Sequence, residues 1–245
     1  MEVSPLPPAQ RQIQSGVTAV APAKGTYKVS EETRSRLIHA AGELFALRGV
    51  DAVTVREIAD KADAVPNAVR YHFGDKAGLV SAVEDFALTP WRDGKLQNYC
   101  SRNDGLYATR DGCRQMITDA IDIFYAHLMP DGQPIWVSMF LLRAVLTSQW
   151  LGKEHEEISR QNMECFCRIF RKVTGNDDHL SAVCWSMAIM SPGMIFSNST
   201  LDYTTMKKSA GVNYTFLRRL QTTVTRNALL ALGLEETQPV QIRGV

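Results

Sequence analysis

The sequence has no charge excess and no apolar run suited to spanning a membrane. Its 27 basic and 26 acidic side chains leave a net charge of +1, so any affinity for nucleic acid must come from a local patch. Two apolar runs, 135–151 and 180–196, are interrupted by Arg143 and by Pro192-Gly193. A charged Arg143 in the middle of the first run would be costly in a lipid-facing helix, and the second run is too short to span a bilayer. Both are predicted to be helices buried in a core or an interface.

Features of secreted proteins, metal sites and common enzymes are also missing. No secretory leader is visible and the five cysteines are an odd number, which favours a cytoplasmic protein with reduced thiols. Cys165 and Cys167 are the only close pair and are interpreted as small buried side chains. The five histidines are scattered, with no H-E-x-x-H motif and no Gly-rich phosphate loop. We therefore expect no enzyme, no cofactor and no metal site. An all-α enzyme and a helical interaction module without DNA binding stay open as alternatives.

What is present is helical periodicity. Hydrophobic residues make up 45% of the chain and no β-alternation is visible, so we predict an all-α protein. Residues 1–29 are rich in Pro, Ala, Ser and Gln and are predicted to be a disordered arm. Residues 30–76 are predicted to form a three-helix domain, 77–234 a larger helical domain, and 235–245 a flexible tail. Further helices are expected near 75–92, 111–128, 134–151, 154–174, 178–198 and 204–232, with a mobile loop at 93–110.

The first domain contains a helix-turn-helix pattern at about 54–73. A preceding helix is expected from about 31, after Ser30 as its N-cap, to Arg48. Thr54 and Glu57 have capping-box spacing, which predicts a second helix to about Ala62. The third helix is predicted as Asn67–Phe73, because Pro66 suits a first helical position and Gly74 ends the helix. Asp75 is expected to cap a fourth helix.

The exposed face of the third helix is the candidate for reading DNA. Arg70 and Asn67 have side chains that can pair bidentately with guanine and adenine in the major groove. Tyr71 and His72 more often contact phosphate or thymine methyl groups. Lys76 and the free backbone N–H groups of the fourth helix would suit a phosphate. Asp60 and Asp63 would repel phosphate and are expected to point away from the groove.

Several short motifs in residues 33–88 closely resemble the DNA-binding domain of TetR-type transcriptional regulators. The matching pieces, in the family's order, are Thr33-Arg34, Ala40-Ala41-x-x-Leu44-Phe45-Ala46-x-Arg48-Gly49, Thr54-Val55-Arg56-Glu57-Ile58-Ala59 and Tyr71-His72-Phe73-Gly74-Asp75-Lys76. The resemblance implies a cytoplasmic homodimer that binds a near-palindromic double-stranded operator, and acts as a ligand-responsive repressor. It implies these DNA-binding residues: Thr54, Arg56, Pro66, Asn67, Arg70, Tyr71, His72 and Lys76.

This chain departs from the family pattern at two positions. The turn commonly has Gly where Asp63 stands, although Asp tolerates the left-handed conformation. The third helix commonly starts with a Ser or Thr cap where Val65 stands, and losing such a cap costs about 1 kcal/mol. Both differences argue against transferring an operator sequence from the family.

By the same resemblance, the C-terminal domain is expected to bind a small molecule and to form the dimer. An apolar effector of unknown identity, neutral or weakly anionic, is expected in a pocket rich in aromatic residues and Met. The candidate residues are Trp136, Met139, Phe140, Arg143, Trp150, Trp185 and Met190. The alternative interpretation of these side chains is a packed helical core. The last two helices are expected to form the dimer interface, with Ala182, Trp185, Ile189, Phe196, Phe216, Leu220 and Leu229 lining it.

Overall fold

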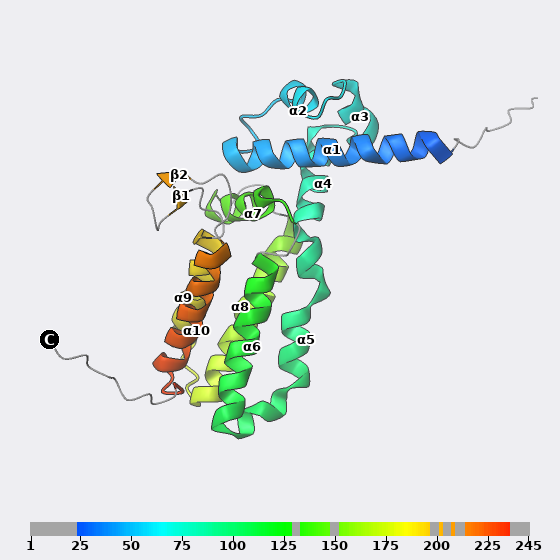
Figure 1. Ribbon diagram of the computed structural model, residues 1–245. Helices are drawn as coiled ribbons and strands as arrows, with labels where there is room; N and C mark the ends of the chain where they lie inside the picture. The colour runs from blue at the N-terminus through cyan, green and yellow to red at the C-terminus, as the bar shows by residue number, and fades with distance from the viewer. Residues whose placement is uncertain are drawn as a thin grey trace, which may run out of the picture.

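The computed structural model describes residues 24–128, 133–147, 152–196, 201–202, 207–208 and 214–235, and within them the protein is all-α. The described part also contains two short strands, β1 (Leu201–Asp202) and β2 (Lys207–Lys208), which pair antiparallel. No described helix is both long and apolar enough to cross a bilayer. The helices form a small N-terminal head on top of a larger bundle (Figure 1).

The head consists of four helices: α1 (Lys24–Arg48), α2 (Val55–Lys61), α3 (Asn67–Phe73) and α4 (Lys76–Leu88). In Figure 1, α1 lies across the top of the bundle with α2 and α3 above it, and α4 descends towards the bundle. Fully buried side chains of α1, α2 and α4 fill the core between them, among them Leu37, Phe45, Ile58 and Leu79. The third helix thus has the predicted bounds, and α4 shares the core of the head.

The start of α1 differs from the prediction. The helix begins at Lys24 instead of at 31, so the last residues of the predicted disordered arm are helical. Ser30 therefore lies inside the helix and is not its N-cap. Pro22 is the last proline before the helix, and no residue between it and Ser30 blocks the helical conformation. The rest of the arm, 1–23, and the tail from 236 lie outside the described residues.

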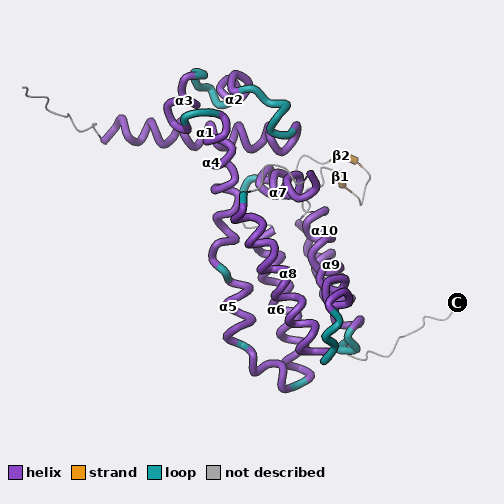
Figure 2. The backbone as a smooth tube through the Cα atoms, turned by 180° about the vertical axis from the view of Figure 1, so that it is seen from behind, coloured by secondary structure: helices purple, strands orange, loops and turns teal. Residues whose placement is uncertain are grey.

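The second domain is built from η1 (Thr89–Asp93), α5 (Lys95–Arg102), η2 (Asp104–Ala108), α6 (Arg110–Leu128), α7 (Ile135–Thr147), α8 (Lys153–Thr174), α9 (His179–Phe196) and α10 (Tyr214–Ala231). Helices α5, α6, α8, α9 and α10 run side by side (Figure 2). The α9–α10 pair forms one flank of this bundle and α5 forms the other. Their shared core includes Met116, Ile117, Phe124, Phe166 and Ile169.

Two predictions for this domain were wrong. The segment 93–110 was expected to be a mobile loop, but it contains α5 and η2 because Leu96 and Cys100 anchor α5 in the bundle core. The last helix begins at Tyr214 and not near 204, and β2 lies within the range predicted as helix. Short Gly-, Asn- and Asp-rich segments still become helical when their few apolar residues can be buried.

Helix α7 lies between the head and the bundle (Figure 1). Trp136, Val137 and Phe140 of α7 belong to the head core rather than to the bundle core. The ring of Trp136 packs so closely on Gly42 of α1 that a Cβ there would overlap it. The domain boundary predicted at residue 77 therefore does not divide the hydrophobic core of the head from that of the bundle, since α7 contributes to the core of the head.

Candidate functional site

The N-terminus of α2 is fixed by the predicted capping box. The Glu57 backbone N–H donates to Thr54 Oγ1 at 3.2 Å, and the Thr54 backbone N–H donates to Glu57 Oε2 at 2.8 Å. Arg48, at the end of α1, donates to Glu57 Oε1 at 2.7 Å. The Thr54 backbone hydrogen bond, followed by that from Arg48, lowers the pKa of Glu57 to about 2. Helix α2 is thereby fastened to α1, with Arg56 exposed on its surface.

The turn between α2 and α3 has the geometry that the sequence required. Asp63 has φ of +49°, the left-handed conformation that was expected of it. Its carboxylate lies 3.7 Å from Arg36 of α1 and is fully exposed, so this ion pair contributes little to stability. Ala59, at the close crossing, is completely buried. A larger side chain there would have to displace neighbouring atoms of the head.

Helix α3 presents a polar face to solvent. Asn67, Arg70 and Tyr71 are all exposed, and Tyr71 retains 78% of its accessible surface. Val69, on the opposite face, is 1% exposed and anchors the helix to the head core. His72 is half-buried beside Tyr71, at 4.9 Å between ring centroids. No side chain caps the N-terminus of α3, as expected from Val65 and Pro66.

The junction between α3 and α4 is tight. Gly74 ends α3 with φ of +81°, and Asp75 caps α4 by accepting the Gly78 N–H at 2.8 Å. A Cβ on Gly78 would collide with the Phe73 carbonyl oxygen. One of the backbone N–H groups expected to bind phosphate is therefore already used by Asp75. Lys76 is half-buried at this junction.

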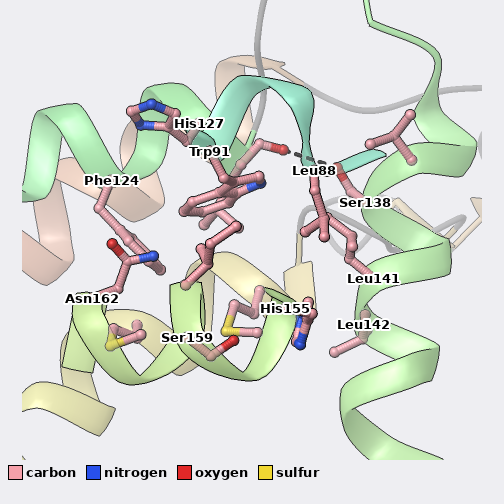
Figure 3. A pocket seen from close by; sticks show the side chains of 15 residues that line it. Leu88, Trp91, Phe124, His127, Ser138, Leu141, Leu142, His155, Ser159 and Asn162 are labelled. Atoms are coloured by element: carbon pink, nitrogen blue, oxygen red, sulfur yellow. Dashed lines mark hydrogen bonds between the residues drawn. The ribbon is translucent and has the colours of Figure 1, made fainter. Parts of the chain in front are cut away.

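A cavity lies below the head, between the end of α4, η1, α6, α7, α8 and α9. It holds about 600 Å³ of space free of protein atoms, counting the solvent at its mouth. Its lining is mainly apolar and includes Leu88, Trp91, Phe124, Leu141 and Leu142 (Figure 3). The polar groups are Ser138, His127, His155, Ser159 and Asn162. None of the described lining residues is Lys, Arg, Asp or Glu.

The cavity is not where the sequence predicts it. Of the seven predicted ligand residues, only Met190 is among the described lining residues. Trp136 donates its indole N–H to His39 at 3.3 Å, and Met139 and Phe140 pack against the head core. Arg143 donates to the carbonyl oxygens of Ala46 and Leu47. Trp185 is buried in the bundle core and donates to Ala228 at 3.3 Å, and Trp150 lies outside the described residues.

Most of the lining residues escape prediction from the sequence because they come from several separate segments. One local signal was available on α8, where polar His155, Ser159 and Asn162 follow at four- and three-residue spacing. Such spacing places all three on one helical face. His155 and Asn162 are buried, at 8% and 6% exposure. Polar residues on the buried face of an amphipathic helix point to a lined cavity.

The expected dimer residues also need correction. Ala182, Trp185, Ile189 and Leu229 are buried within the single chain, at 0%, 7%, 1% and 8% exposure. They pack between α9, α10 and the rest of the bundle, so they cannot form the outer face of α9 and α10. Phe216 and Leu220 are half-buried, and the Phe196 side chain lies outside the described part. Helical periodicity identifies a buried face but not which neighbour buries it.

Known proteins match the head. Residues 37–83 match the model of "Bacterial regulatory proteins, tetR family". The HTH-type transcriptional regulator SrpR of Pseudomonas putida is 43% identical over 61 residues, which are 25% of this chain and 29% of SrpR. The HTH-type transcriptional regulator TtgR, also of P. putida, is 40% identical over 60 residues, or 24% of this chain and 29% of TtgR. The chain thus spans less than a third of these curated relatives.

One solved structure is similar over most of the chain. It is a bacterial regulatory protein in the tetR family from Rhodococcus RHA1, with a TM-score of 0.50 and 19% identity. The alignment covers 79% of this chain and 95% of that one. At this identity, the similarity concerns the fold alone.

Proposed function

We propose that this protein is a sequence-specific DNA-binding repressor that is released from DNA by a small apolar ligand. The premise is that the chain belongs, through its N-terminal domain, to the tetR family of bacterial regulatory proteins. The observation that carries the proposal is the exposed polar face of α3, held rigidly by Val69, the Asp63 turn and the Gly74–Gly78 junction. A short helix with polar side chains outward suits the major groove.

The predicted contacts divide into two kinds. Asn67, Arg70 and Tyr71 are exposed on α3 and are proposed to face base edges or nearby phosphates. Arg and Asn distinguish bases by paired hydrogen bonds. Thr54, Arg56, Pro66, His72 and Lys76 surround that face and are proposed to contact the DNA backbone. Backbone contacts fix the position of the head but carry no sequence information.

The protein is further proposed to bind DNA as a homodimer through the flank formed by α9 and α10. Exposed apolar side chains follow α9 at helical spacing: Leu180, Met187 and Ile195 are 69%, 47% and 50% exposed. Leu230 of α10 is 57% exposed. An apolar flank of this kind is favourable to cover with the same flank of a second copy. Two heads would then meet two half-sites about 34–36 Å apart, or a multiple of that spacing.

The ligand is proposed to enter the cavity below the head. Leu88 and Trp91, which line it, lie at the end of α4 and in η1. Helix α4 begins only three residues after Phe73 ends the DNA-reading helix. A ligand that binds better when α4 is displaced would favour a dimer with wrongly spaced heads. Release of DNA then requires different ligand affinities for the two arrangements.

The DNA-reading proposal is tested with Arg70→Ala and Lys76→Ala. A duplex selected from a random pool by the full-length protein is compared with a scrambled duplex in mobility-shift titrations. Arg70→Ala should weaken binding to the selected duplex by about 1–3 kcal/mol and leave the scrambled duplex nearly unchanged. Lys76→Ala should weaken binding to both duplexes alike. Equal losses on both duplexes for Arg70→Ala would refute its role in reading bases, and failure to select any sequence would refute the function.

A further inference from the structure

His155 is a buried polar side chain that has no side-chain hydrogen bond within the described part of the chain. It lies on the first turn of α8, is 8% exposed and lines the cavity. Its ring nitrogens have no hydrogen-bond partner among the residues that the structure describes. Burial lowers the pKa of His155, so the imidazole is neutral at physiological pH. A neutral imidazole offers one N–H donor and one nitrogen acceptor.

Ser159 lies one turn further along α8 and also lines the cavity (Figure 3). Serine and threonine hydroxyls within helices usually donate to the carbonyl four residues earlier, as Ser101, Thr174 and Ser186 do here at 2.7–2.8 Å. Ser159 makes no such bond in the described structure. Its hydroxyl therefore remains available on the same helical face as His155.

The other polar side chains that could accept a hydrogen bond in the cavity already have partners. Both ring nitrogens of His127 face acceptors, the Ile123 carbonyl at 2.7 Å and Asp93 Oδ1 at 3.0 Å. Ser138 donates to the Leu128 carbonyl at 2.8 Å. The Asn162 side-chain oxygen accepts from Gln97 at 3.0 Å. His155 and Ser159 are thus the two described lining side chains that make no side-chain hydrogen bond and can both donate and accept, whereas Trp91 and Asn162 retain N–H donors.

The chemistry of the lining also limits the charge of a ligand. Moving an ionised carboxylate or ammonium out of water is costly unless an opposite charge or several hydrogen bonds compensate. No Lys, Arg, Asp or Glu is among the described lining residues, and Asp93 already faces His127. A charged ligand would find no unpaired Lys, Arg, Asp or Glu side chain among the described lining residues. Of the two effector types left open by the sequence, the neutral one fits this cavity and the weakly anionic one does not.

We propose that the cavity takes an uncharged, mostly apolar molecule bearing a hydroxyl group, with His155 and Ser159 as the specificity-determining residues that bind this hydroxyl. A hydroxyl both donates and accepts, so it can donate to one of the two side chains while accepting from the other. The apolar body of the molecule would pack against Trp91, Phe124 and Leu141. This inference rests on the proposed function, since it describes the ligand of the same regulator.

The test uses three probes that share one apolar body: naphthalene, 2-naphthol and 2-naphthoate. Their affinities for the full-length protein are measured by calorimetry or by tryptophan fluorescence. 2-Naphthol should bind about tenfold more tightly than naphthalene, which is the effect of one satisfied buried hydrogen bond. 2-Naphthoate should bind more weakly than 2-naphthol.

Variants assign the selectivity to the two side chains. His155→Leu and Ser159→Ala should each bring the affinity for 2-naphthol close to that for naphthalene, while naphthalene binding is retained and shows that the cavity is intact. His179→Leu and Ser101→Ala change the same residue types at exposed positions and should leave the selectivity unchanged. Equal wild-type affinities for 2-naphthol and naphthalene, or preference for 2-naphthoate, would overturn the inference.

The same preparations separate this inference from the proposed function. A protein that shifts its selected duplex but does not distinguish 2-naphthol from naphthalene leaves the regulator proposal standing and refutes the hydroxyl site. A protein that prefers 2-naphthol, loses this preference in His155→Leu and selects no duplex supports the hydroxyl site and refutes DNA binding.

Discussion

Glu57 shows how a single exposed side chain can join three parts of the head. Its carboxylate accepts the Thr54 N–H, the Thr54 hydroxyl and the Arg48 guanidinium. It thereby caps α2, fixes the loop after α1 and ties the two helices together. All of these hydrogen bonds favour the ionised form, which explains the lowered pKa.

The pKa of Glu57 leads to a prediction about pH. Because the folded-state pKa of about 2 lies below the ordinary value of 4.5, its stabilisation is present above about pH 4.5 and is lost as the pH falls towards 2. Glu57→Gln should lower the melting temperature at pH 7, and the difference from wild type should shrink between pH 4.5 and pH 3. Thermal unfolding followed by circular dichroism measures this. A difference that stays constant over that range would contradict the assigned charge.

At the scale of elements, the sequence predicted a helix most accurately where residues with strong local preferences stand at both ends of that helix. Helix α3 was predicted residue for residue because Pro66 and Gly74 bound it, and the turn was predicted because Asp63 tolerates a positive φ. The start of α1 and the helical nature of α5 were not predictable in this way. Helix α5 forms because its own Leu96 and Cys100 are buried against residues of the bundle core that lie far away in the sequence.

The cavity was unpredictable for a related reason. Trp136 and Phe140 have the size and spacing expected of ligand residues, yet they fill the junction with α1. The opposite side of the same helix, with Ser138, Leu141 and Leu142, lines the cavity, and Val137 contacts both the cavity and the head core. Periodicity shows that α7 has two apolar faces, but only the packing shows which face meets the head.

Helix α7 therefore connects cavity and head, and Arg143 is a testable part of this connection. Its guanidinium donates to the Ala46 carbonyl at 3.0 Å and to the Leu47 carbonyl at 2.9 Å, near the C-terminus of α1. Arg143→Leu should lower the free energy of unfolding by about 1–3 kcal/mol, because two charge-assisted bonds to helix-end carbonyls are lost.

Equilibrium urea unfolding measures this change. Arg160→Leu is the matched control, since Arg160 is exposed and bonds to Glu157 and Glu164 of its own helix. That substitution should change the free energy of unfolding by less than about 0.5 kcal/mol. An equal loss in the two variants would mean that Arg143 does not stabilise the α1–α7 junction.

For the whole molecule, the flank formed by α9 and α10 (Figure 2) is the surface proposed to meet a second copy. The apolar side chains that reach solvent on α9 lie at positions 180, 187 and 195, and each is at least 47% exposed. The residues on the inner face of α9, such as Ala182, Trp185 and Ile189, are buried in the bundle core. A second copy would therefore meet the outer row of α9, not the residues selected from the sequence.

Association of two copies is tested with Leu180→Glu and Met187→Glu. Each places a charge in the proposed dimer contact and should raise the dimer dissociation constant tenfold or more, as measured by sedimentation equilibrium. Leu47→Glu makes the same change at a leucine of α1 that is 60% exposed and should leave the constant unchanged. If both α9 variants still dimerise as tightly as the wild type, the dimer contact lies on another face of the protein.

The close contact between Gly78 and the Phe73 carbonyl has a consequence for signalling. Because only glycine fits at this tight joint between α3 and α4, we propose that an inducer tilts each head as a unit and does not turn the reading helix alone. Operators lengthened or shortened by one base pair at their centre should then mimic or offset the inducer.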